Sequence, residues 1–374
     1  MAHIEFDHVT KQYGDVVAVH DITVTIEDRE FFCFFGPPSS GKSTLLRLLL
    51  GLEKPTEGEI RIDGKVVNAQ SPAERNLAMV FQNLALFPHM SARDNLCFPL
   101  VERGVASGVI EERLGGIAEK LHITHLLDKR PAQLSGGERQ RVAIGRALMR
   151  EATAYLMDDP ISALDARLRE EMRVELKRLQ REIGHTFIYV THDQEEAMSV
   201  ADRMTILEHG AVRQIDAPQI IYDRPNSRYV ASIVGSPTMN FVSGELNTAG
   251  EFCSADGSLK VGLPGHYDDR TEVVDLAFRP EDTVLGAAGG MPARVISVEP
   301  LGAFSIVVVD SGSQRLKAMV RGQAVPATGE SITVGVTPSR VALFRRGDGQ
   351  RLEPGASRSP VNIKQNSREE TQPC

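Results

Sequence analysis

The segment that most constrains this chain is a glycine-rich turn that follows an unbroken apolar run. Phe31 to Phe35 has the composition of a strand that is buried on both faces. The turn and the start of the helix-like run after it match the pattern G-x-x-x-x-G-K-[ST], and they read Gly36-Pro37-Pro38-Ser39-Ser40-Gly41-Lys42-Ser43-Thr44. In a strand–loop–helix unit of this kind, the loop N–H groups and the helix dipole converge on one point. The sequence therefore predicts a phosphate-binding loop.

Two residues of this loop carry specific chemistry. Lys42 is predicted to supply a cation to the β- and γ-phosphates of a nucleotide, and the Ser43 hydroxyl to bind Mg²⁺. A second buried run, Ala154 to Met157, ends at Asp158. A carboxylate at the carboxyl end of a strand beside such a loop can hold Mg²⁺, usually through water. We therefore expect Asp158 to share the metal site with Ser43.

A third motif lies between these two and begins another helical run, Arg139 to Arg150. It reads Leu134-Ser135-Gly136-Gly137-Glu138. Ser135 and the N–H groups after it can form a second anion-binding helix terminus. Because one chain then owns two phosphate-binding helix ends, the sequence suggests that ATP is bound between two subunits.

The order of the remaining elements indicates an α/β fold. Alternating apolar residues from Ile4 to Ile26 predict antiparallel strands, and Phe187 to Val190 predicts another buried strand. Apolar residues recur at helical spacing from Leu168 to Ile183. The succession of strand, helix and strand favours a largely parallel sheet that is flanked by helices.

With these motifs in order, the chain resembles the ATP-binding subunit of an ABC transporter, whose signature is LSGGQ-like. Further family motifs are Gln82 in VFQN, the loop Ser162 to Asp165, and His192 in VTHDQEEA, while Tyr13 matches the aromatic residue that stacks on adenine. The resemblance extends to about Leu352. It is closest to importer ATPases of the maltose and glycerol-phosphate type, which carry a C-terminal regulatory domain of the TOBE type.

The resemblance implies a division of roles between two cassettes that close around two ATP molecules. Lys42, Ser43, Gln82 and Asp158 would act from one subunit, and the segment Ser135 to Glu138 from the other. His192 would contact the γ-phosphate, Asp165 would bridge the subunits, and Gln82 with Asn83 to Asn95 would face two transmembrane permease subunits. The cofactors implied are ATP and Mg²⁺, and an extracytoplasmic solute-binding protein would act indirectly.

One residue departs from the family pattern. The family usually has Glu after the Mg²⁺ aspartate, where it polarises the attacking water, but this chain has Asp159. The Asp159 carboxylate is drawn back by about one C–C bond, ~1.5 Å. Because misplacement by about 1 Å can lower a rate roughly 10²-fold, we expect ATP binding to be retained and hydrolysis to be slower.

The predicted domain boundaries follow changes in this pattern. Residues 1–236 form the ATP-binding cassette, with a helical subdomain at about 85–155. Residues 237–350 form a small all-β domain, because short β-like runs alternate there with Gly, Pro and Asp. These runs are Arg294 to Val298, Ser305 to Val309, Ile332 to Val336 and Val341 to Phe344. The polar segment 351–374 is expected to be a disordered tail.

Composition excludes several other classes. The formal net charge of −8 disfavours a general affinity for nucleic acid. The four cysteines lack metal-ligand spacing, and Cys33 in its apolar run fits a reduced, cytoplasmic setting. No signal peptide or membrane span is expected, so the predicted place is the cytoplasmic face of the cell membrane, through the permease partners.

Four questions remain open. A soluble ABC-type protein that acts on DNA or the ribosome would usually show a coiled-coil insertion or two cassettes, and neither pattern is visible. The chain could instead be mainly an ATP-binding, regulatory cassette beside a more active paralogue, a hypothesis that depends on Asp159 alone. The solute could be a sugar or sugar-like compound, a polyamine, an iron complex or another small molecule. The second cassette could be a copy of this chain or a paralogue.

Overall fold

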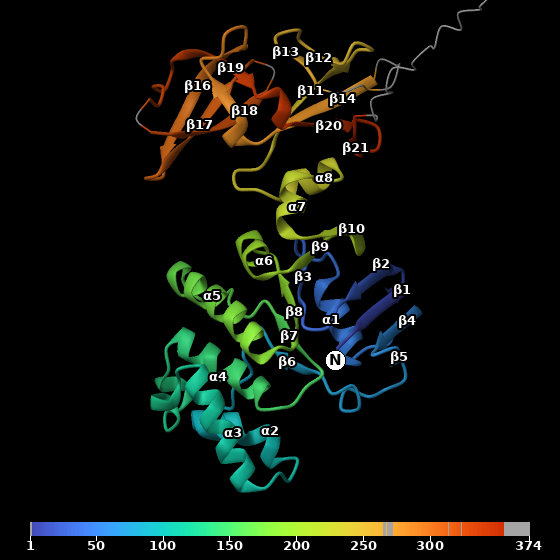
Figure 1. Ribbon diagram of the computed structural model, residues 1–374, viewed down its shortest axis with the longest axis vertical. Helices are drawn as coiled ribbons and strands as arrows, with labels where there is room; N and C mark the ends of the chain where they lie inside the picture. Colours follow the sequence, from blue (N-terminus) through green and yellow to red (C-terminus); the bar gives the residue numbers. More distant parts are fainter. Residues whose placement is uncertain (1, 265–266, 268–271, 313, 323, 355–374) are drawn as a thin grey trace, which may run out of the picture. The chain divides into compact units, whose positions relative to one another are not determined.

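The computed structural model describes residues 2–264, 267, 272–312, 314–322 and 324–354 (Figure 1). Its contacts divide the chain into two compact units, residues 1–226 and 227–374. This division lies ten residues before the boundary expected at 236, because Ala231 packs with Met239, Ala277 and Phe344. No helix among the described residues is long and apolar enough to cross a bilayer.

The first unit contains two sheets, as the alternating and continuous apolar runs predicted. The smaller sheet is antiparallel and has the order β2-β1-β4-β5, with β1 (Ile4–Tyr13), β2 (Val16–Ile26), β4 (Glu57–Ile62) and β5 (Lys65–Val66). The larger sheet has the order β10-β9-β3-β8-β7-β6. Its strands are β3 (Phe31–Phe35), β6 (Ala78–Val80), β7 (Ala154–Asp158), β8 (Thr186–Thr191), β9 (Arg203–Glu208) and β10 (Ala211–Asp216).

Parallel pairing in the larger sheet brings distant loops to one edge. Strands β9, β3, β8, β7 and β6 are parallel neighbours, and only β10 is antiparallel. All five residues of β3 are buried, as a central parallel strand requires. Phe35 pairs with Thr191, and Asp158 pairs with Val190. The segments that follow β3, β7 and β8 therefore leave the sheet side by side.

Helices pack around this sheet and form a separate group below it in Figure 1. Around the sheet are α1 (Lys42–Leu50), α5 (Ala166–Ile183), α6 (Gln194–Val200) and α7 (Pro218–Asp223). The other group is α2 (Ala92–Val101), α3 (Ser107–Lys120) and α4 (Gly136–Leu148), within the predicted helical subdomain. Helix α5 buries Met172, Leu176 and Leu179 at helical spacing.

The second unit begins with α8 (Arg228–Ile233) and continues mainly as strands, as predicted, with short 3-10 helices at Pro280–Asp282 and Pro338–Arg340. One sheet has the order β13-β12-β11-β14-β20-β21, and the other has the order β15-β19-β16-β17-β18. Their strands are β11 (Asn240–Leu246), β12 (Glu251–Ser254), β13 (Lys260–Gly262), β14 (Glu272–Phe278), β15 (Thr283–Leu285), β16 (Met291–Pro300), β17 (Phe304–Asp310), β18 (Arg315–Arg321), β19 (Ser331–Val336), β20 (Val341–Arg345) and β21 (Arg351–Leu352). Side chains from both sheets share one apolar core.

The start of the expected tail needs a correction. Arg351 and Leu352 form β21, which pairs with β20. Leu352 also packs against the apolar core of this unit, and that contact stabilises the strand. The part of the predicted tail from 355 to 374 lies outside the described residues.

Candidate functional site

The predicted phosphate-binding loop connects β3 to α1, as the motif requires. Gly41 adopts a φ of 99°, and a Cβ there would lie 2.7 Å from the Ala18 carbonyl oxygen, so only glycine fits. The next residue, Lys42, begins α1. Its Nζ donates to the carbonyl oxygens of Gly36 and Pro37, each at 2.7 Å. The lysine amine therefore lies over the loop whose N–H groups would receive phosphate.

The acidic side of the site is the carboxyl end of β7. Asp158 ends this strand, and its carboxylate interacts with the Ser43 hydroxyl at the start of α1. Burial raises the pKa of Asp158, and the neighbouring Asp159 raises it further. Burial lowers the pKa of Lys42, while Asp159 and Asp158 oppose that effect. Lys42, Ser43 and the two aspartates thus form one electrostatic cluster.

Asp159 has a strained backbone and a buried, doubly held carboxylate. Its φ is 47°, a left-handed value that Asp adopts more readily than most residues with a side chain. Its N–H donates to the Val190 carbonyl at 2.8 Å, which fixes this conformation. Oδ2 lies 2.9 Å from His192 Nδ1, and Oδ1 lies 3.3 Å from the Thr191 hydroxyl. The structure thus joins two predicted catalytic residues that are far apart in the chain.

His192 presents its other ring nitrogen away from this contact. Its side chain is 54% exposed, and Nδ1 is the atom that meets Asp159. When Nδ1 carries the proton that Asp159 accepts, Nε2 is left as the second functional atom of the ring. The arrangement can therefore orient Nε2 toward a group outside the sheet edge.

Gln82 and Tyr13 lie around this cluster. Gln82 is exposed and follows β6, whose Val80 pairs with Met157 of β7, so Gln82 leaves the same sheet edge as Asp158. Tyr13 ends β1 and is 43% exposed, and its hydroxyl bonds to Glu53 and interacts with Thr44. The Lys11 ammonium lies 4.9 Å from the centre of the Tyr13 ring, so it is the opposite face of this exposed ring that could stack on another group.

The segment Ser135 to Glu138 begins α4 as predicted. Ser135 is the N-cap, its hydroxyl accepts the Glu138 N–H at 3.3 Å, and its own N–H donates to the Glu138 carboxylate at 2.7 Å. These bonds are a capping box. The hydrogen bond from the Ser135 N–H is the main cause that holds the pKa of Glu138 below its usual range. A carboxylate therefore already occupies part of the helix terminus that the motif assigned to phosphate.

Two side chains that contact the site were not predicted from the sequence, Thr191 and Glu196. Thr191 is the last residue of β8, and Glu196 lies in α6 and is fully buried. Both belong to the VTHDQEEA run that contains His192. A signal was present, because an acidic side chain on the buried face of a short helix needs a partner.

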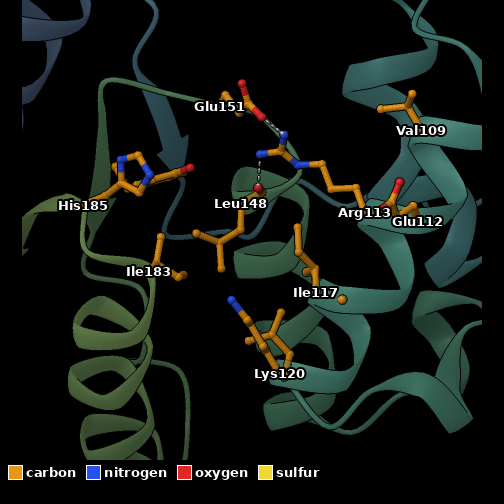
Figure 2. Close-up of a pocket in the computed structure, with 12 residues that line it drawn as sticks. Val109, Glu112, Arg113, Ile117, Lys120, Leu148, Glu151, Ile183 and His185 are labelled. Carbon is orange, nitrogen blue, oxygen red and sulfur yellow. Dashed lines mark hydrogen bonds and ion pairs between the residues drawn. The ribbon is translucent and has the colours of Figure 1, made fainter. Parts of the chain in front are cut away.

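A cavity elsewhere in the first unit contains none of the predicted site residues. It has a volume of 470 Å³ and lies between α3, the end of α4 and the residues that join α5 to β8 (Figure 2). An ion pair of 2.6 Å between Arg113 and Glu151 lies along it, and Ile117, Leu148 and Ile183 form apolar walls. The candidate site is therefore the sheet edge and not this cavity.

Known proteins support the assignment of the fold and the family. The sequence pattern of the ABC transporter family matches residues 19–162, and that of the TOBE domain matches residues 276–344. The chain is 42% identical over 358 residues to the sn-glycerol-3-phosphate import ATP-binding protein UgpC 1 of Rhizobium johnstonii, covering 94% of this chain and 97% of that protein. It is also 42% identical over 371 residues to the xylose/arabinose import ATP-binding protein XacK of Haloferax volcanii, with coverage of 94% and 96%.

A solved structure agrees with these sequence relatives. It is a dimeric, post-hydrolysis form of the ATP-binding cassette MJ0796 bound to ADP and Pi, with a TM-score of 0.51 and 32% identity, covering 57% of this chain and 98% of that one. The expected fold class and the resemblance are confirmed. The chain therefore belongs to the ATP-binding proteins of ABC importers, which are ATPases coupled to transport.

Proposed function

We propose that this chain hydrolyses ATP at the carboxyl edge of its larger sheet and thereby drives the uptake of a sugar or sugar-like solute. The observation that carries the proposal is the convergence of Lys42, Asp158, Asp159 and His192. They follow three neighbouring parallel strands, β3, β7 and β8. A cation for phosphate, a metal-binding carboxylate, and a carboxylate paired with an imidazole are the parts that this reaction needs.

Different residues of the chain bind the phosphates, act on the attacking water and hold the adenine ring. The N–H groups of Gly36 and of Ser39 to Thr44 bind the phosphates, and Lys42 exchanges its loop carbonyls for the β- and γ-phosphate oxygens. Asp159 accepts a hydrogen bond from the attacking water. His192 donates from Nε2 to the γ-phosphate when both ring nitrogens carry a proton, because its Nδ1–H is taken up by Asp159 and phosphate oxygens only accept. Tyr13 stacks on the adenine ring.

The donor set near Lys42 fits Mg²⁺. The Ser43 hydroxyl, the Asp158 carboxylate and the Gln82 side-chain oxygen are hard oxygen ligands, and Ser43 already interacts with Asp158. The bound ion would neutralise charge that develops on the phosphate oxygens. Asp158 is ready for this role because its raised pKa reflects a buried carboxylate that lacks a full counter-charge.

A second cassette completes the site in this proposal. Ser135, Gly136, Gly137 and Glu138 of one chain would meet the nucleotide bound by the other, and Asp165 would lie at the junction. The dimeric cassette that retains ADP and Pi supports this arrangement. Asp165 is the N-cap of α5, where its side chain accepts the Leu168 N–H. The partner is a second copy of this chain or a paralogue.

A groove beside Gln82 supports contact with two permease subunits. It has a volume of 370 Å³ and an apolar lining that includes Phe81, Phe87 and Phe98, and Phe81 is 42% exposed. Arg146 of α4 donates to the carbonyl oxygens of Leu84 and Ala85 at 2.8 and 2.6 Å. These hydrogen bonds connect the groove to α4, the helix that begins at Ser135. Closure of two cassettes can therefore move a permease segment that is bound in the groove.

The named relatives support the class of solute and the location. UgpC and XacK are import proteins for sn-glycerol-3-phosphate and for xylose or arabinose. A polyhydroxylated solute delivered by an extracytoplasmic binding protein is the reading that we favour over a polyamine or an iron complex. The chain would then lie on the cytoplasmic face of the cell membrane, held by its permease partners, and would not bind nucleic acid.

A second candidate function has one specific observation in its favour. The Asp159 carboxylate is bonded to His192 and Thr191 and is nearly buried. If these two contacts leave neither oxygen accessible to water when ATP is bound, Asp159 only orients His192 and leaves water unactivated. The chain would then mainly bind ATP beside a more active paralogue.

Reconstitution tests both candidates. The assembled transporter in liposomes should hydrolyse ATP faster when its binding protein carries a sugar or a sugar phosphate than when it carries a polyamine. ATPase activity that ignores every sugar-type solute would contradict the proposed solute. Activity that survives Lys42→Ala in every copy of this chain would show that a sister cassette is the motor.

We also propose that the two units fold separately. The division at residue 226 and the distinct apolar cores motivate this proposal. A protein ending at residue 226 should bind ATP, and one ending at 236 should expose Ala231 and be less soluble, because its packing partners are removed. ATP binding by neither truncated protein would mean that the cassette needs the second unit.

A further inference from the structure

A buried polar chain extends from the candidate site into the protein, behind Asp159. It passes through Thr191 at the end of β8 to Glu196 in α6, and it ends at Tyr189 of β8. The Thr191 hydroxyl lies 3.3 Å from Asp159 Oδ1 and 2.8 Å from Glu196 Oε2. The Tyr189 hydroxyl donates to the same Glu196 oxygen at 2.8 Å. All four side chains are buried, so water does not compete for these bonds.

The number of protons on these hydrogen-bonded side chains decides whether every bond among them can form. Thr191 Oγ1 accepts the Asp193 N–H at 3.0 Å and has only one hydrogen to donate. If Glu196 were ionised, it would draw the hydroxyl hydrogens of Thr191 and Tyr189, and Asp159 Oδ1 would receive none. If Glu196 is neutral, its own O–H donates to Thr191, and the Thr191 hydrogen is free for Asp159.

Two features of Glu196 agree with the neutral form. Its Oε1 is buried and has no hydrogen-bond partner in the described part of the chain. An ionised oxygen in that position would carry a larger desolvation cost than a neutral carbonyl oxygen. Burial is also the main cause that raises the pKa of Glu196. The hydrogen bonds with Thr191 and Tyr189 oppose this effect, nearby Asp193 and Asp159 add to it, and the net shift of the pKa is upward.

We propose that Thr191 and Glu196 are positioning residues for ATP hydrolysis: they hold the Asp159 carboxylate in the rotation that lets it act on water. This inference rests on the proposed role of Asp159. Thr191 fixes Oδ1 while His192 meets Oδ2, so the carboxylate cannot rotate freely about its last bond. The Asp159 side chain is too short to reach the water from a wrongly rotated position. A misplacement of about 1 Å can lower the rate of a catalysed reaction roughly 10²-fold.

The test is steady-state ATPase activity of the assembled transporter with Thr191→Val, which keeps the shape and removes the hydroxyl. The loss of one positioning hydrogen bond should lower kcat about tenfold. KM for ATP should stay within about twofold, because neither residue touches the nucleotide. Thr191→Ser restores the hydroxyl and should recover most of kcat.

A matched control is available in β9, which β3 separates from β8 in the same sheet. Thr205 of β9 is also fully buried, and its hydroxyl has no partner in the described part of the chain. Thr205→Val should leave both kcat and KM unchanged. A similar fall in kcat for Thr205→Val and Thr191→Val would show a general effect of altering the sheet and would overturn the inference.

Variants of Glu196 test whether its carboxyl group is neutral. Glu196→Gln keeps a neutral donor and should retain most of kcat. Glu196→Ala should lower kcat by less than Thr191→Val does, because the Thr191 hydroxyl is kept but loses the donor that orients it. A large loss with Gln, in protein that still binds ATP and melts normally, would contradict the neutral carboxyl. If the Ala variant does not fold, the Gln variant still decides the point.

Double variants separate failure of this inference from failure of the proposed function. In an Asp159→Asn background, Thr191→Val should cause no further loss, because its effect passes through the missing carboxylate. Equal losses in both backgrounds would overturn the positioning role alone. Full activity of Asp159→Asn would overturn the role of Asp159 and this inference with it, whereas an inactive Asp159→Asn beside an active Thr191→Val would overturn only the inference.

Discussion

Replacement of Asp159 is the sharpest test of this site. Asp159→Asn preserves the size of the side chain and its ability to contact His192 Nδ1 at 2.9 Å, but it removes the negative charge. If Asp159 acts on the attacking water, the loss should be that of a general base, about 10²- to 10⁴-fold in kcat. KM for ATP should change little, because the carboxylate acts on water and not on phosphate.

Asp159→Glu tests whether the short side chain limits the rate, because it keeps the negative charge and lengthens the side chain. The longer side chain moves the carboxylate forward by ~1.5 Å and should raise kcat, by up to about 10²-fold if reach is limiting. The φ of 47° suits Asp better than Glu, so the variant should lose about 1 kcal/mol of stability. Its melting temperature should therefore fall by about 2–4 °C.

The assay is steady-state ATP hydrolysis by the assembled transporter, with ATP binding and melting temperature measured on the same preparations. The order expected for kcat is Glu above Asp above Asn. Equal rates for the three residues would remove Asp159 from the mechanism and favour a sister cassette as the motor. A Glu variant slower than wild type, with normal ATP affinity, would show that Asp159 serves to orient His192 rather than to reach water.

Three further predictions follow from other parts of the site. Lys42→Ala should weaken ATP binding at least about tenfold without unfolding the protein, since it removes the cation of the loop, and calorimetric titration measures this. Glu138→Gln removes a negative charge from the start of α4 and should strengthen ATP-driven dimerisation about threefold, as sedimentation at low salt would show. Burial raises the pKa of Glu196 above its ordinary 4.5, so the folded state binds this proton more tightly than the unfolded state. Its stabilising contribution is complete below pH 4.5 and is lost as the pH rises through the raised pKa. The melting temperature of wild type should therefore fall relative to that of Glu196→Gln over this range, and parallel pH profiles would contradict the shift.

Local patterns determined much of this protein from the sequence alone. The loop from Gly36 to Ser43, the helix start at Ser135 and the apolar runs of the sheet depend on residues close together in the chain. Such elements follow from periodicity, capping and turn chemistry. The parallel order was also predictable, because right-handed strand–helix–strand connections leave few alternatives.

Only the tertiary structure decided what these motifs touch. Asp159 meets His192 because β7 and β8 pair in one register, and neither residue's local sequence encodes that register. The hydrogen bond between Glu196 and Thr191 likewise depends on tertiary structure, because the packing of α6 against the sheet places the Glu196 side chain beside Thr191. The division at residue 226 and the pairing of β21 arise from apolar contacts between segments that are distant in sequence. Burial and register are collective properties of the folded chain, and they decide which of the predicted motifs lie next to one another.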